Sequence, residues 1–383
     1  MMDSTGMKRK IVFLTGTRAD FGKLKSLITI LDNNLHFEVH LFVTGMHLDK
    51  NYGYTIHEIE RCGYKNIFRF DNRDTSGLMD MTLAKTIAGF SEYTRSIKPD
   101  LIIVHGDRIE ALAGASVGAL NNFLVAHIEG GELSGTVDEL IRHAVSKLSH
   151  LHFVANEDAR QRLIQMGERE GDIFITGSPD LDVLLSPTLP ALKEARAHYA
   201  ISFEAYAISM FHPVTTEIES LEEQAEHYFN ALDRSGYNYI LIYPNNDKGA
   251  DKILKHILQR RGSEKYVVFP SLRFEYFLTL LKYAQFIIGN SSAGIREAPY
   301  YGVPAINVGT RQTGRSVHDS VIQSGNTTTE ILHALQNIDQ IHAAPSIDFL
   351  FGSGNSDQLF LKTLIRENIW KTSPQKLFAD LVV

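Results

Sequence analysis

Short apolar runs alternate with amphipathic helical patterns along almost the whole 383-residue chain. Each apolar run predicts a buried strand, and a strand that leads through a helix into a parallel strand closes by a right-handed crossover. The alternation therefore predicts a doubly wound α/β fold with parallel sheets. In the first half, strands are predicted at residues 11–14, 38–43, 101–104, 123–128, 151–154 and 173–175, and helices at 24–31, 109–119, 138–148 and 157–166.

A change of texture between residues 178 and 200 divides the chain in two. Prolines 179, 187 and 190 stand there between polar residues, as in an interdomain linker. The alternation then restarts, and a length of 383 residues also favours two domains over one. We expect a Rossmann-like domain over 7–182, a second over 183–360, and a helical tail over 361–383 that packs back on the first domain. The second domain has predicted strands at 206–211, 239–243, 266–269, 286–288 and 305–308.

Composition limits the possible partners and the compartment. A formal net charge of −7 argues against wide nucleic-acid or anionic-membrane surfaces, although a local basic pocket for a phosphate is compatible with it. The single cysteine, Cys62, excludes an intrachain disulfide and suits a reducing compartment. No apolar run approaches the roughly 18 residues of a membrane helix, and residues 1–10 are too polar for a secretory signal. We expect a cytoplasmic protein without nucleic-acid or membrane partners.

A small-residue loop at 289–297 follows a predicted strand and precedes a predicted helix. Helix N-termini expose unpaired N–H groups and the positive end of the macrodipole, so they bind anions. Ser291 and Ser292 could add hydroxyl donors to a diphosphate, and Glu297, one turn further on, could accept two ribose hydroxyls. An ordinary Asn/Ser cap on a structural helix is the alternative.

The turn after the first strand contains Arg18, which could make a bidentate contact to the same phosphates. A solvated turn arginine is the alternative. This turn has no Gly-x-Gly-x-x-Gly motif, so a dinucleotide cofactor is not favoured. The chain has no P-loop either, and no cofactor is predicted.

Three acids follow neighbouring predicted strands. Asp107 comes after the strand at 101–104, Glu129 comes after the strand at 123–128, and Glu139 opens the next helix. In open α/β sheets the carboxyl ends of the strands form the usual site, and paired carboxylates can donate and accept protons. The alternatives are a helix N-cap for Asp107 and a first-turn dipole contact for Glu139. Spacing alone leaves open whether the three meet.

Histidines accompany these acids. His105 and His127 each stand two residues before an acid, which would suit zinc or manganese, but a compact His-x-x-x-His pair is missing, and no metal is predicted. His212 follows the strand at 206–211 and precedes Pro213, where it could contact phosphate or relay a proton. A buried structural histidine is the alternative.

Taken together, these motifs give the chain a strong resemblance to the UDP-N-acetylglucosamine 2-epimerase family. That family has a glycosyltransferase-B-like fold, in which two Rossmann-like domains have parallel sheets facing a central cleft. The matching stretches cover nearly the whole chain, at residues 16–20, 43–47, 105–108, 127–131, 138–143, 211–215, 244–247, 289–297 and 309–312.

The resemblance assigns roles by position. It implies that the catalytic residues are Asp107, Glu129, Glu139 and His212. It implies that the UDP contacts are Arg18, Asn245, Phe274, Ser291, Ser292, Glu297 and, as a weaker candidate, Arg311. Asp138 replaces a second glutamate found in part of the family, so Glu139 alone receives the catalytic assignment. The resemblance also implies a homodimer that needs no cofactor.

The resemblance implies inversion at C2 through elimination of UDP and a 2-acetamidoglucal intermediate. Whole-chain likeness favours the branch that returns UDP to C1 and supplies UDP-N-acetylmannosamine for capsule or surface polysaccharide. The spelling of residues 105–108, 128–131 and 290–294 is similar to the hydrolysing, sialic-acid-type branch, which releases UDP and free N-acetylmannosamine or its 4-acetamido-6-deoxy analogue. A glycosyltransferase and a nucleotide-sugar sensor are the remaining alternatives.

Overall fold

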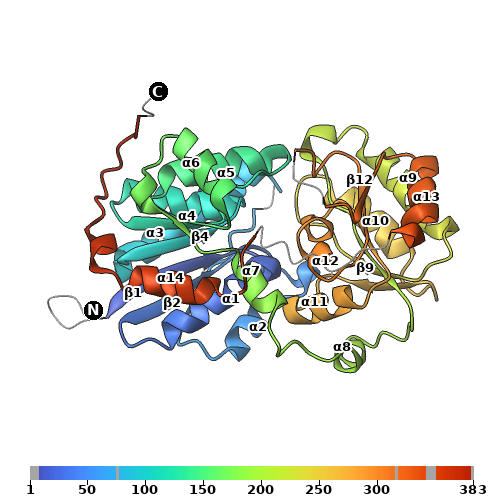
Figure 1. The fold of residues 1–383 in the computed structure, drawn as a ribbon, viewed down its shortest axis with the longest axis horizontal. Coiled ribbons are helices and arrows are strands. Elements are labelled where there is room, and N and C mark those ends of the chain that lie inside the picture. Colours follow the sequence, from blue (N-terminus) through green and yellow to red (C-terminus); the bar gives the residue numbers. More distant parts are fainter. Residues whose placement is uncertain (1–7, 75–76, 315–317, 342–350, 381–383) are drawn as a thin grey trace. The chain divides into compact units, whose positions relative to one another are not determined.

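The computed structural model describes residues 8–74, 77–314, 318–341 and 351–380 (Figure 1). The chain divides into two compact units. The first contains the described residues up to Leu133, the segment Asp138–Ser186 and the described residues from 351 onward. The second contains Ser134–Val137 and the described residues from Pro187 to 341.

The first unit is built on a seven-stranded parallel sheet in the order β3-β2-β1-β4-β5-β6-β7. Strand order reverses direction between β1 and β4, the topological switch point at which open α/β sheets bind ligands. The predicted doubly wound α/β class is confirmed. The strands are β1 (Arg9–Thr15), β2 (Phe37–Val43), β3 (Asn66–Arg69), β4 (Leu101–His105), β5 (Leu124–Ile128), β6 (Leu151–Val154) and β7 (Ile173–Ile175).

Helices cover both faces of this sheet. Helices α1, α7 and α14 pack together, and α3 packs on α4 (Figure 1). Thr17 caps α1 by accepting a hydrogen bond from the Asp20 amide at 3.1 Å, which fixes the chain direction directly after β1. The helices are α1 (Arg18–Asp32), α2 (Ile56–Arg61), α3 (Met79–Ile97), α4 (Ile109–Leu120), α5 (Thr136–Leu148), α6 (Glu157–Gln165), α7 (Pro179–Leu184) and α14 (Ser356–Leu364).

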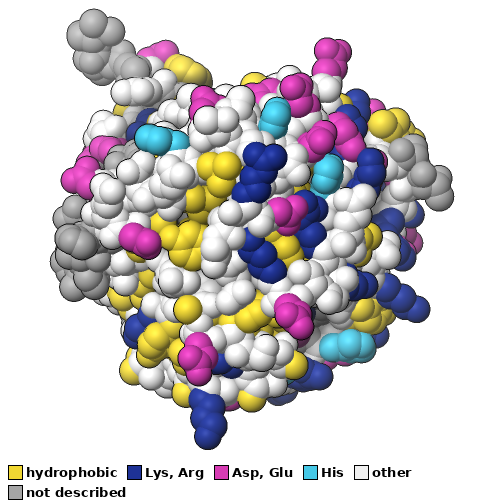
Figure 2. Space-filling view, turned by 90° about the vertical axis from the view of Figure 1, so that its right-hand side faces the viewer, with side chains coloured by type: hydrophobic (Ala, Val, Ile, Leu, Met, Phe, Trp, Pro, Cys, Tyr) yellow, Lys and Arg dark blue, Asp and Glu magenta, His cyan; other side chains and the backbone are white. Residues whose placement is uncertain are grey.

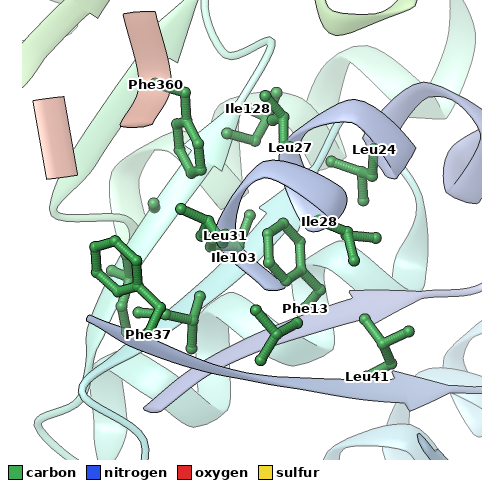
Figure 3. Packing of buried hydrophobic residues seen from close by; sticks show 14 of the residues in the cluster. Phe13, Leu24, Leu27, Ile28, Leu31, Phe37, Leu41, Ile103, Ile128 and Phe360 are labelled. Atoms are coloured by element: carbon green, nitrogen blue, oxygen red, sulfur yellow. The ribbon is translucent and has the colours of Figure 1, made fainter. Parts of the chain in front are cut away.

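One hydrophobic core joins the start of the chain to its end. Figure 3 shows Phe360 of α14 in the same cluster as Leu31 of α1 and Ile128 of β5. The rings of Phe153 and Phe360 pack edge to face with centroids 4.6 Å apart. Trp370 packs against this cluster under the Arg9 guanidinium, which lies 4.2 Å from the ring centroid. Fully burying a side chain such as Phe360 contributes about 1.5–3 kcal/mol, so α14 and the segment after it are bound to the first unit.

The second unit is built on a six-stranded parallel sheet in the order β10-β9-β8-β11-β12-β13. Its strands are β8 (Ala207–Met210), β9 (Tyr239–Ile242), β10 (Tyr266–Phe269), β11 (Ile287–Gly289), β12 (Ala305–Val308) and β13 (Val321–Ser324). Its helices are α8 (Leu192–His198), α9 (Leu221–Arg234), α10 (Ala250–Gln259), α11 (Phe274–Lys282), α12 (Glu297–Tyr300) and α13 (Thr328–Asn337). Short 3-10 turns also occur in both units, among them η1 (Gly45–Leu48) and η5 (Ser292–Gly294).

Charges of both signs are interspersed on the surface of the second unit. Figure 2 shows Lys and Arg side chains beside Asp and Glu side chains on one face. Lys255 of α10 pairs with Glu222 of α9 at 2.8 Å, and Arg260 pairs with Asp233 with Nε 3.0 Å from Oδ1. Within the described part of the chain, every helix is too short or too polar to cross a bilayer.

Candidate active site

Polar side chains gather in the first unit where β4 and β5 end. His105 and Ile128 are paired in the strand register, so the residues that follow, Asp107 and Glu129, lie at the same edge of the sheet. The Glu129 amide still donates to the Phe153 carbonyl at 2.9 Å, and only 3% of Glu129 is exposed. This edge is where the alternation of strands and helices predicts a site.

Glu129 adopts a left-handed backbone conformation, with φ at +63°. A residue with a Cβ held there costs on the order of 1–3 kcal/mol and persists only where its surroundings enforce it. One such contact comes from Arg142 of α5, whose guanidinium donates to the Glu129 carbonyl oxygen. Gly131 follows with φ at +74°, and a Cβ there would lie 2.2 Å from the Ala159 carbonyl oxygen. The Glu-Gly-Gly turn therefore orients the Glu129 carboxylate, and this orientation costs backbone strain energy at Glu129. Such strain is common at functional sites.

His105 lies between two carboxylates. Its Nδ1 is 2.8 Å from Asp20 Oδ1, and its Nε2 is 3.2 Å from Glu129 Oε2. Burial lowers the pKa of His105, but hydrogen bonds and charges from Asp20 and Glu129 outweigh burial and raise it to about 9. His105 is thus an imidazolium at neutral pH, and both of its N–H groups fix the carboxylates on either side.

Arg142 connects the two acids that follow the strands. Besides the Glu129 carbonyl, its guanidinium donates to Asp107 Oδ2, and only 4% of Arg142 is exposed. The turn that carries Asp107 is also held by His127, whose Nε2 is 2.8 Å from the Gly106 carbonyl oxygen. Burial, followed by the charge of Arg142, holds the pKa of His127 well below its ordinary value. A neutral His127 therefore donates to Gly106 and supports the turn.

Glu139 lies in the first turn of α5, three residues before Arg142. Side chains three apart on a helix share a face, so Glu139 is presented by the same helix face that holds Asp107. Its carboxylate is 3.2 Å from His143 Nε2, and 27% of its side chain is exposed. Asp107 and Glu129 are thus joined through Arg142, whereas Glu139 is linked to them by its place on α5.

Arg18, predicted to bind phosphate, lies in the first turn of α1 and pairs with Glu58 of α2 at 2.5 Å. Each of the two side chains is 15% exposed. A guanidinium has five N–H donors in a planar fork, so an arginine that contacts a carboxylate can contact a phosphate at the same time.

The sequence reasoning missed several members of this cluster. Ser178, at the N-terminus of α7, donates to Glu129 Oε1 and lies within hydrogen-bonding distance of Asp180 Oδ1. Asp180 Oδ2 is 2.9 Å from Lys23 Nζ. Ser178 and Asp180 fell in the predicted linker, but Ser178 directly before Pro179 is a typical helix start that could have drawn attention. Asp20 and Arg142 lie in the matching stretches 16–20 and 138–143 but received no role from the sequence.

His47 is a second missed histidine at this end of the sheet. It follows β2 in η1, with Nε2 3.1 Å from Thr15 Oγ1 and Nδ1 2.7 Å from Thr55 Oγ1. Burial lowers its pKa to about 4, against a raising contribution from Asp20. Unlike His105, it is a neutral hydrogen-bonding link between loops.

The second unit has its own polar cluster at the ends of β8, β9 and β11. His212 and Asn290 are joined twice: the His212 amide donates to Asn290 Oδ1 at 2.6 Å, and Asn290 Nδ2 donates to the His212 carbonyl at 2.8 Å. The Asn245 amide donates to His212 Nδ1 at 3.0 Å. Because Nδ1 accepts, the proton of a neutral His212 lies on Nε2, which makes that nitrogen the donor.

The predicted anion loop begins differently from expectation. Ser291 caps only the 3-10 turn η5, accepting from the Ala293 amide at 3.3 Å, and α12 starts afresh at Glu297. The loop was expected to precede a helix with Glu297 one turn further on, whereas Glu297 is the first residue of α12. Helix α12 ends after four residues, and Gly294 and Pro299 both disfavour a continuous helix. Ser291 and Ser292 thus lie at the start of a 3-10 turn and not at the N-terminus of a long α-helix.

Two other predicted contacts lie in the second unit. Arg311 donates to the Asn290 carbonyl at 3.3 Å, beside Gln312, which donates to the same oxygen at 2.8 Å. Arg311 is thereby placed next to Ser291. Phe274 is the first residue of α11, and only 6% of it is exposed. Within the described residues, no group of three or more His, Cys, Asp or Glu side chains is arranged to hold a metal ion.

Comparison with known proteins identifies relatives over nearly the whole chain. Residues 29–365 match the family described as UDP-N-acetylglucosamine 2-epimerase. The chain is 50% identical over 375 residues to the UDP-N-acetylglucosamine 2-epimerase of Neisseria meningitidis serogroup B, covering 97% of this chain and 99% of the relative. It is 36% identical over 340 residues to the hydrolysing UDP-N,N'-diacetylbacillosamine 2-epimerase of Legionella pneumophila, covering 86% and 89%.

Solved structures agree on the fold. The Methanocaldococcus jannaschii UDP-GlcNAc 2-epimerase, solved in complex with UDP-GlcNAc and UDP, aligns with a TM-score of 0.78 and 21% identity, over 93% of this chain and 99% of that chain. A Neisseria meningitidis UDP-GlcNAc 2-epimerase bound to UDP-GlcNAc aligns with a TM-score of 0.75 and 17% identity, over 93% and 99%.

Proposed function

The chain belongs to the UDP-N-acetylglucosamine 2-epimerase family, and we propose that it inverts C2 of UDP-N-acetylglucosamine with the carboxylates of the first unit as proton carriers. The observation that carries this assignment is Glu129. It is buried, held in a left-handed conformation, and hydrogen-bonded to a histidine that stays charged. Perturbed and strained groups of this kind concentrate at active sites.

The chemistry requires the neighbouring bond to break first. The hydrogen on C2 is not next to a carbonyl, so its direct removal is unfavourable. When the C1–O bond breaks, UDP leaves with the electron pair and C1 becomes oxocarbenium-like, which acidifies C2. A carboxylate then takes the C2 proton to give 2-acetamidoglucal. Addition of a proton to the opposite face of C2 and return of UDP to C1 give UDP-N-acetylmannosamine.

Roles follow from this sequence of steps. An acid and a base on opposite faces of the ring are needed, and Asp107, Glu129 and Glu139 are the candidates. The imidazolium of His105 fixes Glu129, and Arg142 fixes Asp107. These contacts hold the carboxylates without needing a cofactor.

UDP is proposed to bind through groups that carry partial or full positive charge. The Nε2–H of His212, the Ser291 and Ser292 donors, Arg311 and Arg18 stabilise the leaving diphosphate. Glu297 accepts the ribose hydroxyls, and Asn245 and Phe274 contact the uridine. The support is that Asn290 contacts both His212 and Arg311, and that the Asn245 amide donates to His212.

A second candidate outcome is hydrolysis, in which water replaces UDP at C1 and free N-acetylmannosamine is released. The Legionella relative, a hydrolysing enzyme at 36% identity, favours it. The Neisseria relative at 50% identity favours return of UDP, and we propose that outcome. We also propose a cytoplasmic homodimer that supplies surface polysaccharide. The single cysteine in the sequence, Cys62, supports the compartment, and the family resemblance supports the homodimer and the pathway.

One incubation tests the proposal. The protein is mixed with UDP-N-acetylglucosamine in heavy water and followed by NMR. We expect deuterium at C2 and UDP-N-acetylmannosamine, with no acceptor added. Free N-acetylmannosamine with stoichiometric UDP would establish the hydrolysing outcome. Unchanged substrate would refute both.

A further inference from the structure

Ser178 lies between two buried carboxylates of the first unit. Its Oγ is within hydrogen-bonding distance of Glu129 Oε1 and of Asp180 Oδ1. Exposure is 1% for Ser178, 3% for Glu129 and 1% for Asp180, so the three groups are buried from bulk solvent. The backbone on both sides is fixed, because the Ser178 amide donates to the Phe351 carbonyl at 2.6 Å and α7 starts at Pro179.

Counting hydrogens limits the protonation of this trio. A serine hydroxyl has one hydrogen to donate, and its oxygen can accept two. If both carboxylates were ionised, that hydrogen could be donated to only one of them, and the other would face a serine lone pair across a buried contact. Such an arrangement is strongly unfavourable in a low-dielectric interior. One additional hydrogen, on Glu129 or on Asp180, turns both contacts into donor–acceptor pairs.

The surrounding charges leave both positions for that hydrogen accessible. Lys23 Nζ, 2.9 Å from Asp180 Oδ2, stabilises an ionised Asp180. His105, itself held by Asp20, stabilises an ionised Glu129. A cationic side chain thus contacts the second oxygen of each carboxylate, and Ser178 connects their first oxygens.

We propose that Ser178 and Asp180 form a relay that switches Glu129 between base and acid. With the shared hydrogen on Asp180, that hydrogen is donated to Ser178 Oγ, the serine hydrogen is donated to Glu129, and Glu129 is an ionised base. When Asp180 passes its hydrogen to Oγ and Oγ passes its own to Glu129, Glu129 becomes an acid and Asp180 a carboxylate. Two O–H bonds break and two form, and the total number of protons is unchanged.

The relay gives Glu129 what reversible epimerisation needs. One direction of the reaction requires a base on a given face of C2, and the reverse requires an acid there. A buried carboxylate exchanges protons with solvent slowly, whereas a neighbouring store resets it directly. Ser178 and Asp180 act through Glu129 and are positioning residues. This functional role rests on the proposed function, but the shared hydrogen does not.

Infrared spectroscopy tests the shared hydrogen without any substrate. Wild-type protein at neutral pH is compared with Asp180→Asn in water and in heavy water. We expect a C=O band of a protonated carboxyl group that shifts in heavy water and is missing from Asp180→Asn, because the one remaining carboxylate is then satisfied by the serine. Ser149→Ala, which removes a buried serine hydroxyl that donates to the Val145 carbonyl, keeps the band. A band that persists unchanged in Asp180→Asn overturns the shared hydrogen.

Kinetics test the relay. Asp180→Asn keeps the shape of the side chain but cannot store a proton, and Ser178→Ala breaks the connection. We expect kcat to fall by about 100-fold in both, the size of a proton-transfer contribution, with KM unchanged and a larger solvent isotope effect on kcat. Ser178→Thr, which keeps a hydroxyl, restores most of kcat, and Ser149→Ala matches wild type. Circular dichroism confirms folding of each variant.

The outcomes separate the two proposals. Wild-type kcat and isotope effect in folded Asp180→Asn overturn the relay and leave the epimerase assignment intact. A wild-type protein that leaves UDP-N-acetylglucosamine unchanged overturns the epimerase assignment and the switching of Glu129 together, and the infrared band still decides whether the hydrogen is shared.

Discussion

The sheet edges of the two units are built from different kinds of contact. In the first unit, charged side chains hold one another: Asp20, His105 and Glu129 form a chain of hydrogen bonds with a charged imidazole at its centre. In the second unit, side chains are hydrogen-bonded to the backbone instead. The Asn290 side chain bonds both the amide and the carbonyl of His212, and the His212 imidazole accepts from the Asn245 amide. Charged, protonatable contacts suit proton transfer, and backbone-anchored contacts suit rigid binding. From this difference we expect the first edge to control turnover and the second edge to control the affinity for UDP.

The largest effect should come from neutralising the acids of the first edge. Glu129→Gln and Asp107→Asn keep shape but cannot take a proton, so kcat should fall by about 10³-fold or more, while UDP binding stays near wild type. Turnover is measured by NMR and UDP affinity by calorimetry. Glu60→Gln, at a half-buried position paired with His57 and Arg69 and remote in sequence from the candidate acids, serves as the control. A folded Glu129→Gln protein with weakened UDP affinity but an unchanged kcat would reverse the comparison between the two edges.

The next effect concerns the charge on His105. Its folded-state pKa of about 9 lies above the ordinary 6.5, so its contribution to folding is fully present below pH 6.5 and is lost as pH rises through 9. The shift corresponds to about 3 kcal/mol. The free energy of unfolding, measured with urea from pH 6 to 10, should fall more steeply for wild type than for His105→Gln.

A second histidine of this edge, His47, gives an internal check of sign. His47 has a pKa lowered to about 4, so its contribution is present above 6.5 and is lost as pH falls toward 4. His47→Asn should flatten the acid side of the stability curve and leave the alkaline side unchanged. Equal behaviour of the two variants would contradict the assigned charges.

The fold was largely predictable because burial of strands is a local property. Central strands such as β4 and β5 are continuous apolar runs, and their ends locate Asp107 and Glu129. The strands β3 and β13 were missed because they are edge strands with partly exposed residues and no apolar run. Edge strands need little burial, so their sequences carry a weak signal.

Much of the candidate site was not predictable for a different reason. The contact between Ser178 and Glu129 joins residues 49 positions apart, and no spacing rule predicts it. The charge on His105 depends on Asp20, 85 positions away, and on Glu129 across the neighbouring strand. The left-handed turn at Glu129 was signalled only by the two glycines that follow it. Tertiary contacts, rather than motifs, decide which neighbours a side chain meets.

A smaller effect is expected at the edge of the second unit. Asn290→Ala removes both contacts to the His212 backbone, and 1% of Asn290 is exposed. Leaving buried polar groups unpaired costs about 1–3 kcal/mol, and a displaced His212 should raise the Kd for UDP by about tenfold, or 1.4 kcal/mol. Deuterium exchange at C2 should persist at saturating substrate. The surface variant Asn238→Ala is the matched control. Loss of exchange at saturation would mean that this edge also takes part in proton transfer.

The smallest effect should come from an ion pair on the surface of the second unit. Comparing it with a largely buried ion pair separates the effect of charge pairing from the effect of burial. Lys255 and Glu222 lie 2.8 Å apart with 62% and 43% of their side chains exposed, and water screens such pairs almost completely. Lys255→Gln should leave kcat, KM and the midpoint of urea unfolding within error of wild type. Arg18→Gln, which breaks a pair whose side chains are each 15% exposed, should raise KM measurably. A larger effect of Lys255→Gln than of Arg18→Gln would mean that burial of an ion pair at the first edge does not determine its importance. The contrast between the two edges would then lose its physical basis.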